Sequence, residues 1–292
     1  MRFLFVDQIT NSIPGERIQG LKHVTADDFY LLPQADGYWH FMPSLIGETL
    51  GQLAAWNVMQ YKAFRLRPVA GVVAKVHIYR PVTLGETLHL QADIERLDDT
   101  AVLYNACASV NGENVFAIES ALGPLLPMED FIDPEQAKAQ YNEIYRLSDV
   151  QNTPNVRYTV QRHPGMVCAA PAYDQLLEFT PQESMKMAKL ITRQAPFFPD
   201  HFPRKPVLPM TVLLECSLSM AKDFLEKSAF QESWRLIRIQ RVKMNEFVHP
   251  GDSLQTELKV KNYSEEELVL IFKTEMRGKR VCVMEAIFSN RE

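Results

Sequence analysis

The chain has 292 residues, of which 46% are hydrophobic and 23% are charged. These values are typical of a soluble globular protein, and the length suggests two domains or one large one. The net charge of −5 and the pI near 5.9 give no electrostatic reason to expect nucleic acid, because nucleic acids bind to basic protein surfaces. A small molecule or another protein is therefore the expected partner.

The N-terminal stretch MRFLFVDQ has too few apolar residues for a signal peptide. Nowhere do about eighteen apolar residues run together, as a transmembrane helix requires. The four cysteines are far apart and form no C-x-x-C pair, which indicates neither a disulfide framework nor a zinc site. We therefore expect a cytoplasmic protein that has no membrane association and no metal.

Internal repetition divides the chain into two related halves. A shift of 167 positions places residues 6–25, VDQITNSIPGERIQGLKHVT, over residues 173–192, YDQLLEFTPQESMKMAKLIT, without a gap. The same shift pairs Glu48 with Glu215, and a shift of 166 continues the match toward the C-terminus. These matches indicate that one domain has been duplicated.

In the first half, a short β-rich lead is followed by one helix and several strands. Residues 44–63 are apolar on nearly every face, which is typical of a buried helix. The segments after this helix are rich in β-branched residues and carry turn signals such as Asn111–Gly112. Strands are predicted over 71–80, 86–97, 101–110 and 114–122.

The second half repeats this order after a polar connection. Residues 127–155 contain no long apolar run, which suits a linker with some helix. A second apolar helix is predicted over 210–226, and strands are predicted over 236–247, 253–262, 267–276 and 280–288. We therefore expect an N-terminal domain over 1–126 and a C-terminal domain over 156–292.

The Pro-rich segment before the second helix carries the most informative motif. Residues 195–216 read APFFPDHFPRKPVLPMTVLLEC, with His201 in a turn that prolines stiffen. This run resembles the signature of the 3-hydroxyacyl-carrier-protein dehydratases of fatty acid synthesis, H-F-P-G-x-P-x-x-P-G followed by an acidic residue. The resemblance covers most of both halves. It implies an α+β double hot-dog fold, in which two helices are each wrapped by antiparallel strands that form one continuous sheet, as in a dimer.

The resemblance implies dehydration of a 3-hydroxyacyl thioester of acyl carrier protein or coenzyme A to the trans-2-enoyl thioester, in fatty acid or polyketide-type biosynthesis. Removing water from this substrate requires a base for the hydrogen beside the carbonyl, an acid for the departing hydroxyl and a donor to the thioester oxygen. A histidine accepts a proton near neutral pH, and a carboxyl group against an apolar wall has a raised pKa and donates one. No cofactor is expected.

In that family, the histidine of one hot dog works with the carboxylate of its neighbour. Carried over to this chain, the pattern pairs His201 as base with Glu48 as acid. Glu48 is followed by Gln52 on the same helical face, which matches the family's acidic-x-x-x-Gln pattern, whereas Glu215 is followed by Ser219. The first half therefore has the better acid motif, and Gln52 is expected to orient the carboxyl group.

Three residues around the motif are expected to bind or orient the substrate, namely Phe202, Pro209 and Met210. The backbone N–H of Met210 is expected to polarise the thioester. Met210 replaces a glycine of the family pattern, so its side chain narrows the tunnel. Arg204 also stands where the family has glycine. Because of these two departures from the family pattern, we expect a substrate that differs in shape from that of the family.

The equivalent second site is expected to be a relic. Gln34 occupies the position of His201, and an amide does not take up protons near pH 7. His40 lies nearby but aligns with Val207. Glu215 is expected to be a buried carboxylate satisfied by helix-end N–H groups. We therefore predict one composite site in a chain that is a monomeric pseudo-dimer or a homo-oligomer of it.

Two other function classes are compatible with the fold that the resemblance implies. A hot-dog thioesterase would use a carboxylate and a water without needing His201, and a non-catalytic acyl-binding hot dog would need no such residue. The H-F-P-x-x-P context disfavours the first class. The joint presence of His201, Glu48 and Gln52 disfavours the second.

Overall fold

The computed structural model describes residues 2–33, 37–146, 171–228, 230 and 233–291. The elements of the N-terminal part are β1 (Gln8–Ile13), β2 (Arg17–His23), β3 (Leu31–Pro33), β4 (Trp39–Phe41), α1 (Pro43–Tyr61), β5 (Leu66–Pro68), β6 (Val72–Ile78), β7 (Thr87–Leu97), β8 (Ala101–Val110), β9 (Glu113–Pro127), the 3-10 helix η1 (Met128–Asp130) and α2 (Pro134–Ile144). Those of the C-terminal part are β10 (Gln175–Thr180), β11 (Ser184–Leu190), α3 (Met210–Ser228), β12 (Arg235–Met244), β13 (Ser253–Tyr263), β14 (Glu267–Met276) and β15 (Lys279–Ser289).

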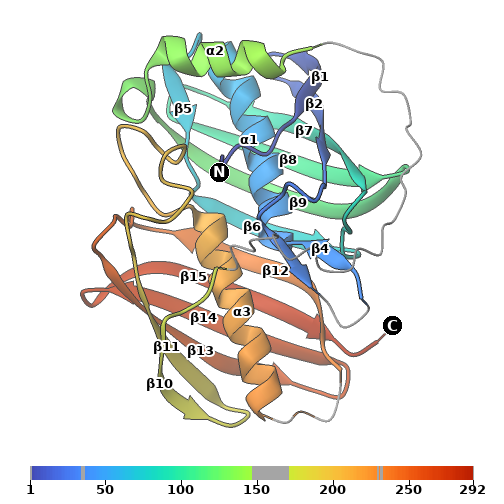
Figure 1. Ribbon diagram of the computed structural model, residues 1–292, viewed down its shortest axis with the longest axis vertical. Helices are drawn as coiled ribbons and strands as arrows, with labels where there is room; N and C mark the ends of the chain where they lie inside the picture. The colour runs from blue at the N-terminus through green and yellow to red at the C-terminus, as the bar shows by residue number, and fades with distance from the viewer. Residues whose placement is uncertain (1, 34–36, 147–170, 229, 231–232, 292) are drawn as a thin grey trace.

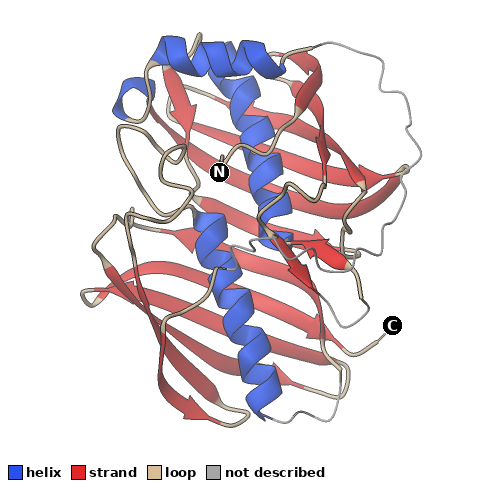
Figure 2. Cartoon of the chain, in the orientation of Figure 1, coloured by secondary structure: helices blue, strands red, loops and turns tan. Residues whose placement is uncertain are grey.

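One antiparallel sheet runs through both halves in the order β1-β2-β7-β8-β9-β6-β12-β15-β14-β13-β11-β10, with β5 paired to β9 (Figure 1). Strands β6 and β12, one from each half, are neighbours at its centre, where Val76 lies opposite Ile239. Strands β3 and β4 form a separate pair. The predicted α+β double hot dog, with one helix per half against a continuous sheet, is confirmed (Figure 2).

The duplication is reproduced element by element. The bounds of β1, β2 and α1 become those of β10, β11 and α3 when 167 is added to each residue number, and β7 and β8 become β13 and β14 with 166. The hairpin turns match as well, because Asn111–Gly112 and Arg277–Gly278 all have positive φ. Positive φ at both central residues is the type I′ geometry that suits the twist of antiparallel strands.

Helices α1 and α3 are buried because their apolar residues cover several faces. In α1, Leu45, Leu50 and Leu53 are completely buried. Pro43 stands in the first turn, where its missing N–H costs no hydrogen bond. The two helices contact each other, and their N-terminal ends meet at the boundary between the halves (Figure 1). Side chains of both first turns are thereby brought together inside the molecule.

The strands bury one face against the helices. In β7, Leu88, Leu90 and Ala92 are buried and alternate with partly exposed residues. This period of two follows from the pleat of the strand, which sends successive side chains to opposite faces. The sheet therefore supplies a continuous apolar wall beside α1.

Helix α2 falls within the segment expected to be a linker. Its N-cap Asp133 accepts hydrogen bonds from the N–H groups of Glu135 and Gln136. Ala137 and Tyr141 are buried, and the ring of Tyr141 lies 6.1 Å from that of Trp56 on α1. Helix α2 thus covers the end of the N-terminal hot dog. Residues 147–155, and residue 156 as the predicted start of the C-terminal domain, lie outside the described residues.

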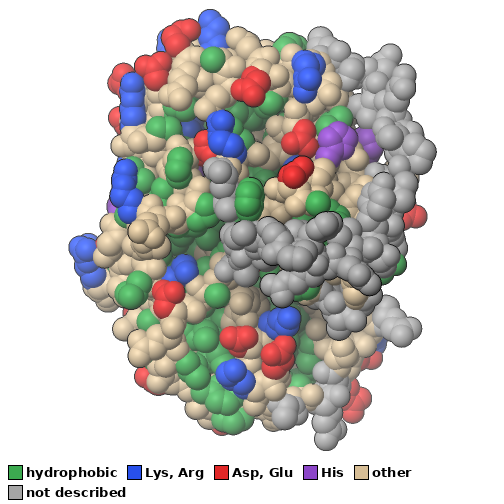
Figure 3. Space-filling view, in the orientation of Figure 1, with side chains coloured by type: hydrophobic (Ala, Val, Ile, Leu, Met, Phe, Trp, Pro, Cys, Tyr) green, Lys and Arg blue, Asp and Glu red, His purple; other side chains and the backbone are tan. Residues whose placement is uncertain are grey.

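Across the described part of the chain, no helix is both long enough and apolar enough to cross a membrane. On the face shown in Figure 3, acidic and basic side chains are interspersed. This mixture agrees with the small net charge of −5.

Candidate active site

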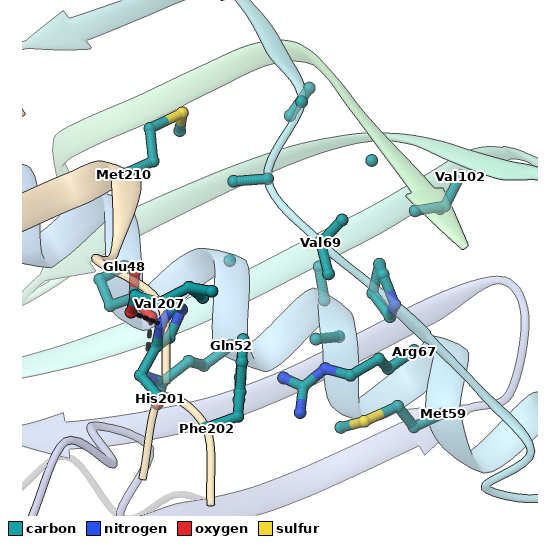
Figure 4. Close-up of a pocket in the computed structure, with 18 of the residues that line it drawn as sticks. Glu48, Gln52, Met59, Arg67, Val69, Val102, His201, Phe202, Val207 and Met210 are labelled. Atoms are coloured by element: carbon teal, nitrogen blue, oxygen red, sulfur yellow. Dashed lines mark hydrogen bonds between the residues drawn. The ribbon is translucent and has the colours of Figure 1, made fainter. Parts of the chain in front are cut away.

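A cavity of about 170 Å³ lies beside α1, where the two halves meet. Glu48 and Gln52 reach it from α1, and His201, Phe202 and Met210 reach it from the other half (Figure 4). For comparison, a cavity of about 150 Å³ takes a benzene molecule, so this one takes a short chain segment. In the residues that the structure describes, no group of three or more His, Cys, Asp or Glu side chains could hold a metal ion.

The Pro-rich segment before α3 fixes the position of His201. Its backbone N–H donates to the Phe197 carbonyl at 2.8 Å, and its own carbonyl accepts from the Val207 N–H at 3.1 Å. Nδ1 lies 2.9 Å from the Val207 carbonyl oxygen. Because a carbonyl only accepts, Nδ1 carries the proton, and Nε2 keeps its lone pair. Nε2 has no hydrogen-bond partner among the described residues.

The surroundings of His201 favour its neutral form. Its ring stacks on that of Phe202 with 3.9 Å between centroids, and the ring of Phe3 approaches to 5.9 Å. Burial lowers the pKa of His201 to about 3; the hydrogen bond to Val207 opposes this shift and the charge of Arg67 adds to it. The imidazole is therefore neutral at physiological pH, the form in which Nε2 accepts a proton.

Two donors hold the carboxyl group of Glu48. Gln52 Nε2 lies 2.9 Å from Oε1, and the hydroxyl of Thr211, on α3, lies 2.6 Å from Oε2. Burial raises the pKa of Glu48, while these two hydrogen bonds and the charge of Arg67 act in the opposite direction. A carboxyl group with a raised pKa keeps its proton closer to neutral pH and can give it to a departing hydroxyl.

The N-terminal segment is attached to both sides of this arrangement. Gln52 accepts a hydrogen bond from the Phe5 N–H at 2.9 Å and donates one to the Phe3 carbonyl at 3.0 Å. Asp200, the residue before His201, accepts from the Phe3 N–H at 2.7 Å and from Arg2 Nε at 3.0 Å. Residues 2–5 therefore connect α1 to the His201 loop. Sequence reasoning missed this role, because it tested the segment only as a signal peptide.

Met210 lines the cavity and begins α3. The first N–H groups of a helix have no partner within it, and the Met210 N–H makes no hydrogen bond to any described residue. Pro209 is not among the cavity-lining residues; its carbonyl accepts from the Leu213 N–H at 3.2 Å. Arg204 contacts the α2 region instead of the cavity, through an ion pair with Asp133 at 3.1 Å.

The second carboxylate is closed off from this cavity. Glu215 is only 4% exposed and accepts hydrogen bonds from the Ser44 N–H at 3.3 Å and from the Ser44 hydroxyl. Burial raises the pKa of Glu215, and the bonds to Ser44 oppose the rise. Neither Glu215 nor His40, which lies in β4, is among the cavity-lining residues. Gln34, the equivalent of His201, lies outside the described residues.

Arg67, on β5, is a further charged residue in the cavity that sequence reasoning missed. Its guanidinium carbon lies 3.8 Å from the ring centroid of Phe202 and 5.5 Å from that of Phe131. Burial lowers the pKa of Arg67 to about 10, and the charge of Glu48 opposes this shift. The segment FRLRP gives no sign of this burial, because either of its two arginines would be expected to be a solvated cation.

Comparisons with known proteins relate the chain to one group of enzymes. The family model of the ApeI dehydratase, in the ApeI-like family, matches residues 178–285. A 3-hydroxyacyl-[acyl-carrier-protein] dehydratase, FabZ, of Shewanella loihica is 30% identical over 126 residues, which cover 41% of this chain and 81% of the relative. The enzyme of the same name from Shewanella woodyi is 27% identical over 157 residues, covering 50% of this chain and 98% of the relative.

Solved structures resemble the chain in fold across both halves. An acyl-ACP thioesterase from Bacteroides thetaiotaomicron superposes with a TM-score of 0.54 over 93% of this chain and 98% of its own. Its sequence is only 13% identical, so this similarity concerns the double hot-dog architecture alone.

Proposed function

Because the chain belongs to the family of 3-hydroxyacyl-[acyl-carrier-protein] dehydratases, we propose that it converts a 3-hydroxyacyl thioester to the trans-2-enoyl thioester. One observation carries this proposal: His201, with a free Nε2, and Glu48, with a raised pKa, line the same cavity from opposite halves. These are the base and the acid that elimination of water requires.

In the proposed reaction, Nε2 of His201 takes a proton from C2 of the substrate. The electron pair of that C–H bond forms the C2–C3 double bond while the bond from C3 to the hydroxyl oxygen breaks. Glu48 gives its proton to this oxygen, so water leaves. The imidazolium and the carboxylate return to their starting forms when a proton passes from one to the other.

Three groups support the transition state in this proposal. The free N–H of Met210, at the positive end of the α3 dipole, donates to the thioester oxygen as it gains charge. Gln52 and Thr211 hold the two oxygens of Glu48 in one orientation. The hydrogen bond from Nδ1 to Val207 keeps the Nε2 lone pair of His201 available.

We further propose that this is the one working site and that its substrate is a thioester of acyl carrier protein or coenzyme A, in fatty acid or polyketide-type biosynthesis. The separation of Glu215 from the cavity supports a single site. The relatives' name, which specifies acyl carrier protein, supports the first carrier.

Turnover of defined thioesters tests the proposal. Purified protein is incubated with 3-hydroxyacyl thioesters of several chain lengths, on coenzyme A and on acyl carrier protein, and enoyl product and free thiol are followed separately. Enoyl formation without thiol release, lost in His201→Ala, is expected. Thiol release without enoyl product would instead identify a thioesterase, and the absence of both products would identify a binding protein.

A further inference from the structure

Two polar side chains in the cavity have no hydrogen-bond partner. The Nε of Arg67 is completely buried and unpaired, and the Arg67 guanidinium makes no hydrogen bond or ion pair with any described residue. The hydroxyl of Tyr104, on β8, is likewise without a hydrogen-bond partner in the described part of the chain. It faces α1, because a Cβ placed on Gly51 would lie 3.6 Å from it.

Unpaired donors in a cavity are costly unless something that enters the cavity satisfies them. The contact between Arg67 and Phe202 does not do so, because a guanidinium that stacks on a ring keeps its in-plane N–H groups free. The side chains drawn nearest to Arg67 in Figure 4, those of Met59 and Val69, are apolar, and no hydrogen bond from Arg67 to a described residue is formed. The N–H groups of Arg67 and the hydroxyl of Tyr104 are therefore available to donate hydrogen bonds to an oxygen atom of a ligand.

The position of Arg67 indicates which part of a substrate it would meet. Met210 lies next to Glu48, whereas Arg67 lies farther away, past Gln52 and beside Met59 (Figure 4). With the thioester oxygen at the Met210 N–H, the acyl chain beyond C3 runs toward Arg67. The guanidinium carbon of Arg67 lies 3.8 Å from the ring centroid of Phe202, and that centroid lies 3.9 Å from the ring centroid of His201. The guanidinium carbon is therefore at most about 8 Å from the centre of the imidazole.

We propose that Arg67 and Tyr104 bind an oxygen acceptor on the acyl chain, and that the preferred substrates are short 3-hydroxyacyl thioesters that end in a carboxylate. The inference rests on the proposed dehydration and names its substrate class. The four carbon–carbon bonds from C2 to the carboxylate carbon of a six-carbon chain span about 5 Å, which is within the upper limit of about 8 Å between the imidazole and Arg67, so a six-carbon chain is the length chosen for the test. Arg67 also supplies the charge that a desolvated carboxylate requires.

A bound carboxylate would also help the reaction. The charge of Arg67 lowers the pKa of His201, so it opposes the imidazolium that forms when Nε2 takes the proton. A carboxylate paired with Arg67 offsets this charge. The same contact therefore favours binding of the acidic chain and proton transfer to His201.

The test compares two substrates of equal length, 3-hydroxyadipyl and 3-hydroxyhexanoyl thioesters, each on coenzyme A and on N-acetylcysteamine. Wild-type kcat/KM should favour the carboxylate end with either carrier. Arg67→Met should lower the ratio of kcat/KM for the adipyl substrates to that for the hexanoyl substrates about 10- to 100-fold, as expected for the loss of a hydrogen bond between charged groups. Tyr104→Phe, which is isosteric, should cost the adipyl substrates a smaller factor.

Arg204→Met is the matched control, because Arg204 is paired with Asp133 and does not line the cavity. This variant should leave kcat/KM unchanged for both substrates. An equal loss on both chain ends in Arg67→Met would overturn the proposal, as would a wild-type preference for the hexanoyl chain. A loss confined to the coenzyme A thioesters, equal for both ends, would assign Arg67 to the carrier and also overturn it.

Calorimetry with the non-reacting adipyl and hexanoyl N-acetylcysteamine thioesters separates this proposal from the dehydration itself. An Arg67-dependent preference for adipyl binding without turnover of any substrate would uphold the acidic subsite and refute the dehydration. Dehydration of both chains with equal efficiency and equal binding would uphold the dehydration and refute the subsite.

Discussion

Thr211 donates a hydrogen bond to Glu48 across the boundary between the halves, with 2.6 Å between Oγ1 and Oε2. The hydroxyl of Ser44 donates to Glu215 in the opposite direction. The offset of 167 residues that relates the halves maps Ser44 onto Thr211 and Glu48 onto Glu215. Duplication has thus preserved one contact twice, but only the copy at Glu48 opens onto the cavity that contains His201.

Replacing Thr211 with valine tests what this contact does for Glu48. The hydrogen bond from Thr211 lowers the pKa of Glu48, so its loss raises that pKa. An acid works in its protonated form, so activity should persist to higher pH in Thr211→Val. We expect the basic limb of the kcat/KM profile to move upward and the maximum to fall about tenfold because the carboxyl group is less well oriented.

Ser44→Ala is the matched control, because it removes the equivalent bond to Glu215. It should reduce the free energy of unfolding by about 1–3 kcal/mol, as expected when a buried carboxyl group loses a donor, and leave the pH profile of turnover unchanged. A shifted profile in Ser44→Ala together with an unchanged one in Thr211→Val would reverse the roles of the two carboxylates.

Gln52→Leu should affect both turnover and the N-terminal segment. Gln52 bonds Glu48, the Phe3 carbonyl and the Phe5 N–H. Its loss should lower kcat by about 10-fold or more and accelerate hydrogen exchange at the Phe5 amide, measured by NMR or mass spectrometry. Gln60→Leu provides the comparison, since Gln60 is on the same helix and bonds Ser12 at 3.2 Å. If Gln60→Leu lowered turnover equally, a general effect on α1 would explain the result.

The free energy of unfolding should depend on pH in acid because His201 is buried in its neutral form. Its pKa is about 3 in the folded protein and 6.5 when the side chain is solvated, so the unfolded chain binds this proton at higher pH. The corresponding stability is complete above pH 6.5 and is lost as the pH falls toward 3, with a slope of up to about 1.4 kcal/mol per pH unit. Denaturant titrations of wild type and His201→Gln should show their difference in unfolding free energy shifting against wild type between pH 6.5 and 4. A difference that does not vary with pH would contradict the buried, neutral state.

The fold could be predicted because its signals are local and occur twice. The helix predicted over 44–63 is α1 (Pro43–Tyr61), and that predicted over 210–226 is α3 (Met210–Ser228). The strand predicted over 101–110 has the bounds of β8 (Ala101–Val110). Apolar runs and β-branched segments decide these elements, and each half repeats them. The short strands β3, β4 and β5 were missed, since three residues carry too little periodicity for a prediction.

The site was only partly predictable. The motif indicated His201 and Glu48, which do line one cavity, but it also indicated Pro209, which does not. Arg67 was missed because its burial depends on Phe202, far away in the sequence. Thr211 did leave a signal: it and Ser44 each stand four residues before one of the repeated glutamates. Chain spacing alone, however, does not reveal that each hydroxyl serves the carboxylate of the other half.

The proposed site across the two halves is tested most directly by steady-state dehydration of one 3-hydroxyacyl thioester by Glu48→Gln and Glu215→Gln, each confirmed as folded by circular dichroism. Removing an acid or base lowers rates by about 10²–10⁴, so Glu48→Gln should lower kcat by that factor, as should His201→Ala. Glu215→Gln should stay within about threefold of wild type, because Ser44 is the one hydrogen-bond partner of Glu215 among the described residues and Glu215 does not line the cavity. Full activity in Glu48→Gln together with loss of activity in Glu215→Gln would contradict the pairing of His201 with Glu48.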